Sequence, residues 1–90
     1  MEIKHDKKEQ IFYTIFDSKE SYIRYSMPNK ERINILRTFV PPEQRHNGLA
    51  GKLAKAALEF AKENNLKVIP TCSYVDYFID INKEYQELLA

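Results

Sequence analysis

The chain has 90 residues, of which 43% are hydrophobic and 12% aromatic, so we expect a single small domain spanning residues 1–90 with its own core. Fourteen Lys and Arg residues and thirteen Asp and Glu residues are interleaved and give a net charge of +1, which indicates no nucleic-acid partner. No run approaches the roughly 18 apolar residues of a membrane span, and the first thirty residues hold no apolar signal segment, so we expect a cytoplasmic protein outside the membrane.

Cysteine occurs once, at Cys72. A single cysteine excludes a disulfide within the chain, and it is not part of a metal-binding cluster. We therefore predict no metal site, and any special role of Cys72 must be that of a thiol.

Short β-rich runs alternate with polar turns through the first forty residues, which is typical of a meander of antiparallel strands. In the last of these runs, Ile33 and Ile35 fall on the same face, as the two-residue period of a strand requires. We expect the last strand to be the longest. The predicted strands cover residues 2–5, 10–16, 22–27 and 32–40.

The best-defined helix is predicted for residues 48–63, after a polar loop at 41–47. Its apolar positions recur at helical spacing, and the polar pair Asn64-Asn65 ends it. Residues 67–71 resemble a buried strand, so strand, helix and strand form a βαβ unit whose two strands lie parallel. With short helices predicted for 74–80 and 83–89, the chain is expected to adopt an α+β fold with a mixed, mostly antiparallel sheet.

The start of the long helix is a candidate anion site. Asn47 is a suitable N-cap, and Gly48 has no side chain to keep a ligand away from the backbone. The first turn lacks the usual Asp or Glu and includes Lys52. An external anion, such as a phosphate, would therefore complement the positive end of the helix dipole.

The same segment carries a family resemblance. Arg45-His46-Asn47-Gly48-Leu49-Ala50 fits the signature Arg/Gln-x-x-Gly-x-Gly/Ala of the GNAT superfamily of N-acetyltransferases. With Val40-Pro41, Asn65 to Tyr74 and Glu84-Tyr85, residues 32–89 resemble very small, single-domain GNAT-like candidate acetyltransferases.

The resemblance implies a sheet that opens between the strand before the loop and the strand after the helix, with acetyl-CoA as cosubstrate in the opening. Pantetheine would follow the strand backbone at 38–40, and the pyrophosphate would bind the loop at 45–50. The implied acetyl-CoA-binding residues are Thr38, Phe39, Val40, Arg45, His46, Asn47, Gly48, Leu49, Ala50 and Lys52.

Acetyl transfer needs a proton for the departing thiolate, and it sometimes uses a protein nucleophile. Cys72, at the end of the second parallel strand, is a candidate nucleophile, and Tyr74 and Tyr77 are candidate proton donors. The alternative for all three is a packing role, because cysteines are commonly buried and tyrosines often fill core edges. His5 is expected to be a surface residue.

Two positions depart from the family pattern. His46 stands where relatives often have Gly, and Arg37 stands where they tend to have a His. Arg cannot act as a base at neutral pH, because its pKa is above about 12. The predicted function is acetyl-CoA-dependent transfer of an acetyl group to an unidentified amine. The alternatives are a CoA or acyl-CoA binding module with little turnover and a structural domain, and the oligomeric state is left open.

Overall fold

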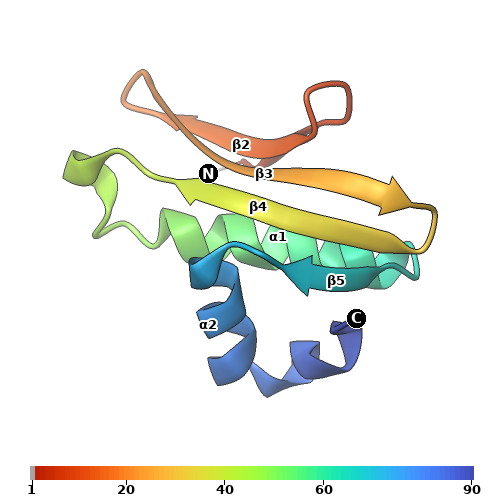
Figure 1. The fold of residues 1–90 in the computed structure, drawn as a ribbon. Coiled ribbons are helices and arrows are strands. Elements are labelled where there is room, and N and C mark those ends of the chain that lie inside the picture. The colour runs from red at the N-terminus through yellow and green to blue at the C-terminus, as the bar shows by residue number, and fades with distance from the viewer. Residues whose placement is uncertain (1) are drawn as a thin grey trace.

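Five strands form one sheet, and their order in space follows their order in the chain (Figure 1). The computed structural model describes residues 2–90. Neighbouring strands are antiparallel from β1 to β4, whereas β5 lies parallel to β4, so the sheet is mixed as predicted. The strands are β1 (Lys4–Asp6), β2 (Ile11–Phe16), β3 (Lys19–Asn29), β4 (Arg32–Phe39) and β5 (Lys67–Pro70).

The helices follow the sheet in the predicted order. Helix α1 (Leu49–Glu63) links β4 to β5 and runs behind them in Figure 1, and α2 (Ser73–Ile81) follows β5. Two 3-10 helices, η1 (Pro42–Gln44) and η2 (Lys83–Leu88), lie in the loop before α1 and after α2. The α+β prediction with a βαβ unit is confirmed. Within residues 2–90, no helix is long and apolar enough to cross a bilayer.

The core lies between the sheet and α1. Ile33 and Ile35 are both fully buried, which confirms that they lie on the same face of β4 and shows that this face points into the core. They pack in one cluster with Leu53 and Ala57 of α1 and with Val75 of α2. Helices α1 and α2 are in close contact at Gly51. A Cβ atom at this position of α1 would lie 3.6 Å from the Tyr74 hydroxyl of α2, which is van der Waals distance.

The prediction that the strand at residues 32–40 is the longest is wrong. Strand β3 has eleven residues and β4 has eight. The extra length of β3 includes Pro28, which cannot donate a hydrogen bond to a neighbouring strand. The pairing of β3 with β4 is irregular between Ser26 and Asn29, so Pro28 lies within a bulge, where a missing donor is tolerated.

His5 is not the surface residue that we expected. It pairs with Phe12 across β1 and β2, which turns its side chain toward the face that α1 covers. Its ring stacks on Phe12 at 4.0 Å between centroids and meets Phe60 of α1 edge-on at 4.8 Å. Its Nε2 lies 2.5 Å from the Tyr25 hydroxyl. Burial, and secondarily the positive charge of Lys7, lowers the pKa of His5 below its ordinary value of 6.5.

Helix α1 begins one residue later than predicted, and Asn47 is not its N-cap. Gly48 occupies that position with a left-handed backbone, φ +71°, which glycine adopts without the strain of a side chain. The predicted stop at Asn64-Asn65 is confirmed, because α1 ends at Glu63 and Asn64 is its C-cap.

Candidate functional site

Strands β4 and β5 are paired along only half of β4. Their ladder runs from Arg32 opposite Lys67 to Ile35 opposite Pro70. Beyond it, the backbone N–H of Cys72 donates to the Ile35 carbonyl at 2.8 Å, and the chain then turns into α2. Strand β4 continues to Phe39, past the end of β5 (Figure 1). Residues 36–39 therefore have β3 on one side and an open backbone edge on the other.

Two local features produce this opening. Pro70 ends β5 and cannot donate a further ladder hydrogen bond. On the other side of β4, Arg24 pairs with Arg37 but Tyr25 pairs with Ile35, so Leu36 is an extra residue in β4. A bulge of this kind bends a strand and increases its twist, so β4 changes direction where its pairing with β5 ends.

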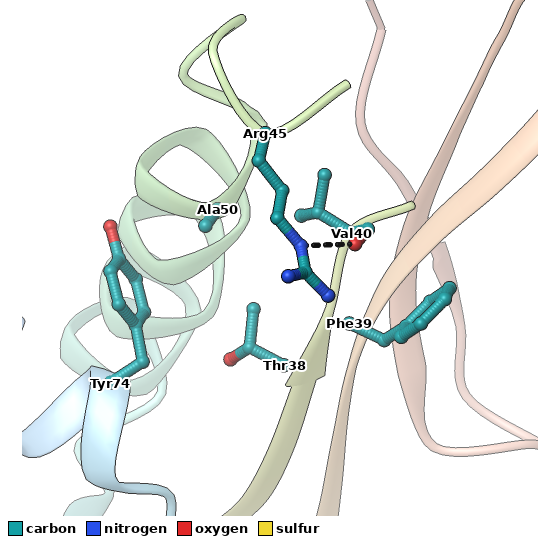
Figure 2. A pocket seen from close by; sticks show the side chains of 6 residues that line it. All are labelled: Thr38, Phe39, Val40, Arg45, Ala50 and Tyr74. Atoms are coloured by element: carbon teal, nitrogen blue, oxygen red, sulfur yellow. Dashed lines mark hydrogen bonds between the residues drawn. The ribbon is translucent and has the colours of Figure 1, made fainter. Parts of the chain in front are cut away.

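A pocket of about 310 Å³ lies at the open end of β4. Its walls come from the end of β4, the following loop, the first turn of α1 and the first turn of α2 (Figure 2). The lining residues are Thr38, Phe39, Val40, Arg45, Ala50 and Tyr74. The structure thus brings five of the predicted acetyl-CoA-binding residues together with one predicted proton donor.

The loop beside the pocket is fixed by two side chains. Arg45 extends along the pocket wall, and its Nε donates to the Val40 carbonyl at 3.1 Å (Figure 2). Gln44 is only 3% exposed, and its Nε2 donates to the Phe16 carbonyl at the end of β2, at 2.6 Å. Sequence reasoning missed Gln44, because a glutamine between charged residues in a polar loop gives no sign of burial.

The start of α1 faces this loop without any side-chain cap or acidic residue in its first turn. The first helical hydrogen bond joins the Lys52 N–H to the Gly48 carbonyl at 3.2 Å. The N–H groups of Leu49, Ala50 and Gly51 come before it, so they have no acceptor within the helix. Such an end attracts anions through its dipole and its free donors.

The remaining predicted ligand residues lie outside the pocket lining. His46, Asn47, Gly48 and Lys52 are exposed around the start of α1. The side chain of Leu49 is buried in the interior at 1% exposure, so only its backbone is available to a ligand.

The predicted catalytic residues lie at different distances from the pocket. Cys72 is half-buried, and its Sγ is 3.4 Å from the hydroxyl of the lining residue Thr38, but Cys72 is not itself among the lining residues. Tyr74 lines the pocket directly. Burial raises the pKa of its phenol above the ordinary value of 10, and the neighbouring Tyr77 and Cys72 raise this pKa further. Tyr77 is 58% exposed and is not among the lining residues.

Within residues 2–90, no group of His, Cys, Asp and Glu side chains is arranged to hold a metal ion. The donors available to a ligand at this site are therefore backbone N–H groups, the Arg45 guanidinium and the hydroxyl groups of Thr38 and Tyr74.

Comparison with known proteins assigns the chain to a family. Residues 11–88 match the family model described as GCN5-related N-acetyl-transferase, and the chain belongs to this family. The chain is 31% identical over 90 residues to "Protein NATD1" of Danio rerio, covering 98% of this chain and 82% of that protein. It is 30% identical over 82 residues to "Protein NATD1" of Homo sapiens, covering 89% and 73% of the two chains.

A solved structure shows the same fold. The solution structure of a GCN5-like candidate N-acetyltransferase from Staphylococcus aureus superposes with a TM-score of 0.78 and 35% sequence identity. The match covers 99% of this chain and 87% of that one. The fold implied by the resemblance of residues 32–89 is therefore confirmed over nearly the whole chain.

Proposed function

We propose that the protein transfers an acetyl group from acetyl-CoA to the nitrogen of an amine. The observation that carries this proposal is the pocket between the open end of β4 and the uncapped start of α1. It joins a strand edge with free backbone groups to a helix end that attracts anions. Membership of the GCN5-related N-acetyltransferase family supports the same chemistry.

In the proposed complex, the pyrophosphate of CoA accepts hydrogen bonds from the free N–H groups of Leu49, Ala50 and Gly51. The Arg45 guanidinium adds a positive charge at the same end of the pocket. The pantetheine arm follows the backbone of residues 38–40, where β4 has no β5 partner. Its amide groups would then extend the ladder at the open edge as a strand does.

The proposed reaction is a direct transfer. The amine nitrogen attacks the thioester carbonyl carbon, a C–N bond forms, the C–S bond breaks, and the amine loses its proton to solvent. A backbone N–H at the open edge of β4 stabilises the negative charge that develops on the carbonyl oxygen. The Tyr74 hydroxyl, protonated at neutral pH because its pKa lies above 10, gives its proton to the departing thiolate and takes up another from solvent.

A nucleophilic role for Cys72 remains a prediction. In that route the acetyl group would first form a thioester with Sγ, which requires a thiolate and so a base or a cation beside it. The side-chain hydrogen bond of Cys72 within residues 2–90 is with the Thr38 hydroxyl, and either group can be the donor. A hydroxyl group is neither a base nor a cation at neutral pH. Intact-protein mass spectrometry after incubation with acetyl-CoA tests this route. An acetyl adduct in the parent that is lost in Cys72→Ala would establish it.

The alternative function is a CoA-binding module with little turnover, and Arg37 favours it, because Arg supplies no base. Calorimetric titration with CoA, followed by measurement of thiol release from acetyl-CoA with added amines, separates the two functions. We expect CoA binding and amine-dependent thiol release. Binding without release for any amine would favour the module, and absence of CoA binding would exclude both.

A further inference from the structure

Two arginines and two aromatic residues form a square on the face of the sheet that α1 leaves uncovered. Tyr22 pairs with Phe39 across β3 and β4, and Arg24 pairs with Arg37 in the adjoining row. Tyr22 and Arg24 flank Ile23, which points into the core at 0% exposure, so both lie on the opposite face. Phe39 and Arg37 share that face because they are their cross-strand partners. We call these four residues the arginine–aromatic square.

The contacts within the square hold its side chains over the sheet. The rings of Tyr22 and Phe39 lie 5.7 Å apart between centroids. The Arg24 guanidinium carbon is 5.6 Å from the centre of the Tyr22 ring, and that of Arg37 is 5.8 Å from the centre of the Phe39 ring. Both arginines are exposed, and both rings are half-buried. The square therefore consists of two rings tilted by 32° to each other, each with a guanidinium group over it.

This arrangement is unfavourable without an anion. Like charges directly opposite each other on neighbouring strands destabilise a sheet. Arg24 donates one hydrogen bond, to the Glu9 carbonyl at 3.2 Å. In the part of the chain that the structure describes, the one salt bridge joins Lys19 to Glu43, so no carboxylate of residues 2–90 neutralises either arginine. A bound carboxylate or phosphate would relieve the repulsion and accept charge-assisted hydrogen bonds.

The square adjoins the proposed acetyl-transfer site. Phe39 belongs to both, because it lines the pocket and its ring points away from Tyr74 and Ala50 in Figure 2. Arg37 directly precedes Thr38, another lining residue, on the half of β4 that has no β5 partner. A molecule on the square would therefore approach the open edge of β4 from the face opposite to α1.

We propose that the square selects the acceptor, and that the acceptor is an amine carrying a carboxylate or phosphate group. The anion binds between Arg24 and Arg37, and the apolar part of the acceptor lies on the rings of Tyr22 and Phe39. This inference rests on the proposed acetyl transfer. Two guanidinium groups suit a single anionic group, whereas a nucleic acid is bound through contacts to many phosphates along its backbone.

The test compares acceptors that differ only by the anion. Thiol release from acetyl-CoA is measured with L-phenylalanine against phenethylamine, and with phosphoethanolamine against ethanolamine, with rates expressed per unit of deprotonated amine. We expect kcat/KM to be about tenfold or more higher for the anionic member of each pair, because hydrogen bonds to a charged group contribute about 1.5–3 kcal/mol.

Variants assign the preference to the square. In Arg37→Gln and Arg24→Gln, the preference for the anionic acceptor is expected to fall about tenfold through a higher acceptor KM, while the KM for acetyl-CoA stays at the parental value. Arg32→Gln is the matched control. It removes another exposed arginine from β4, and Arg32 also lies opposite a cation, Lys67 of β5. Arg32 is at the end of β4 that is paired with β5, away from the square. This variant should retain the parental preference.

The outcomes separate this inference from the proposed function. Equal kcat/KM values within each pair, in a protein that binds CoA and releases thiol, would overturn the inference alone. A rise in the KM for acetyl-CoA in Arg37→Gln would reassign the square to CoA. Arg37-dependent binding of a single-stranded oligonucleotide would reassign it to nucleic acid.

If no amine turns over, the CoA-loaded protein is titrated with phosphoethanolamine and observed by NMR. Shifts of the amide signals of β3 and β4 that Arg37→Gln abolishes would support the inference, and unchanged signals would overturn it. A failure of CoA itself to bind would refute the proposed function, and the acceptor inference would be refuted with it.

Discussion

The two halves of β4 differ in how many neighbours they have. At residues 32–35 the strand is paired on both sides, with β3 and with β5, and Ile33 and Ile35 are fully buried. At residues 36–39 it is paired only with β3, and its side chains line a pocket on one face and the arginine–aromatic square on the other. One strand thus provides the centre of the core and the edge of the candidate site. The paired half should govern stability, and the open half should govern binding and catalysis.

The largest expected effect is on stability, at the paired half. Ile33→Ala removes a side chain with 0% exposure and leaves a cavity in the core. We expect a loss of about 2–5 kcal/mol in the free energy of unfolding, measured by urea titration. Leu36→Ala, at a residue with 37% exposure on the open half, is the control and should cost much less. Similar losses in the two variants would contradict the division of β4.

A large effect on rate is expected at the open half. Tyr74→Phe removes the hydroxyl proposed to protonate the CoA thiolate and keeps the ring that lines the pocket. General acids typically contribute about 100-fold or more to a rate. We expect kcat to fall by about this factor while CoA affinity and the free energy of unfolding change little. Tyr77→Phe, at an exposed residue outside the lining, should keep the parental kcat.

A smaller effect is expected on cofactor affinity. Ala50→Glu places a carboxylate in the first turn of α1, beside the proposed pyrophosphate position. Calorimetry should show CoA affinity at least about tenfold weaker through charge repulsion, while the helix itself is stabilised by about 0.3–1 kcal/mol, since an acid complements the dipole there. Lys55→Gln makes the same change in charge at an exposed position of α1 that does not line the pocket. If both variants weaken the affinity for CoA equally, the effect is one of net charge and the helix start is not the phosphate site.

The smallest expected effect is a change in folding stability with pH, caused by His5 of β1. The pKa of His5 is lowered in the folded state, so below pH 6.5 the unfolded chain binds a proton that the folded chain does not. Stability should therefore decrease as the pH falls from about 6.5 toward the lower pKa of the folded state. Urea titrations of the parent and His5→Phe at pH 7.5 and 5.5 test this. A parent that loses no more stability than His5→Phe would show that His5 is not responsible.

The βαβ unit and the loop beside the pocket could be predicted from local sequence. The alternation of Ile33 and Ile35 and the helical spacing of the apolar residues in α1 depend on neighbours along the chain, so the βαβ unit was predicted correctly. The segment Arg45 to Ala50 also identified the loop beside the pocket through the family motif.

What sequence reasoning missed depends on contacts between distant segments. The burial of His5 results from its pairing with Phe12, and a strand of three residues has too little pattern to show which face points inward. The pairing of Arg24 with Arg37 depends on the extra residue Leu36, whose bulge resets the register. Asn47 is a residue type that often caps helices, but the N-cap is Gly48. The N-cap backbone is left-handed here, and glycine adopts that conformation more easily than asparagine.

The hydrogen bond from Gln44 to Phe16 has a consequence for the speed of ligand capture. It joins the loop after β4 to the end of β2, through a side chain that is almost completely buried. A loop held in this way pays its ordering entropy during folding and does not have to become ordered when a ligand arrives. CoA should therefore bind in a single kinetic phase whose observed rate rises linearly with CoA concentration. Gln44→Ala would introduce a slower loop-closing phase, visible in stopped-flow traces as a rate that levels off at high CoA concentration.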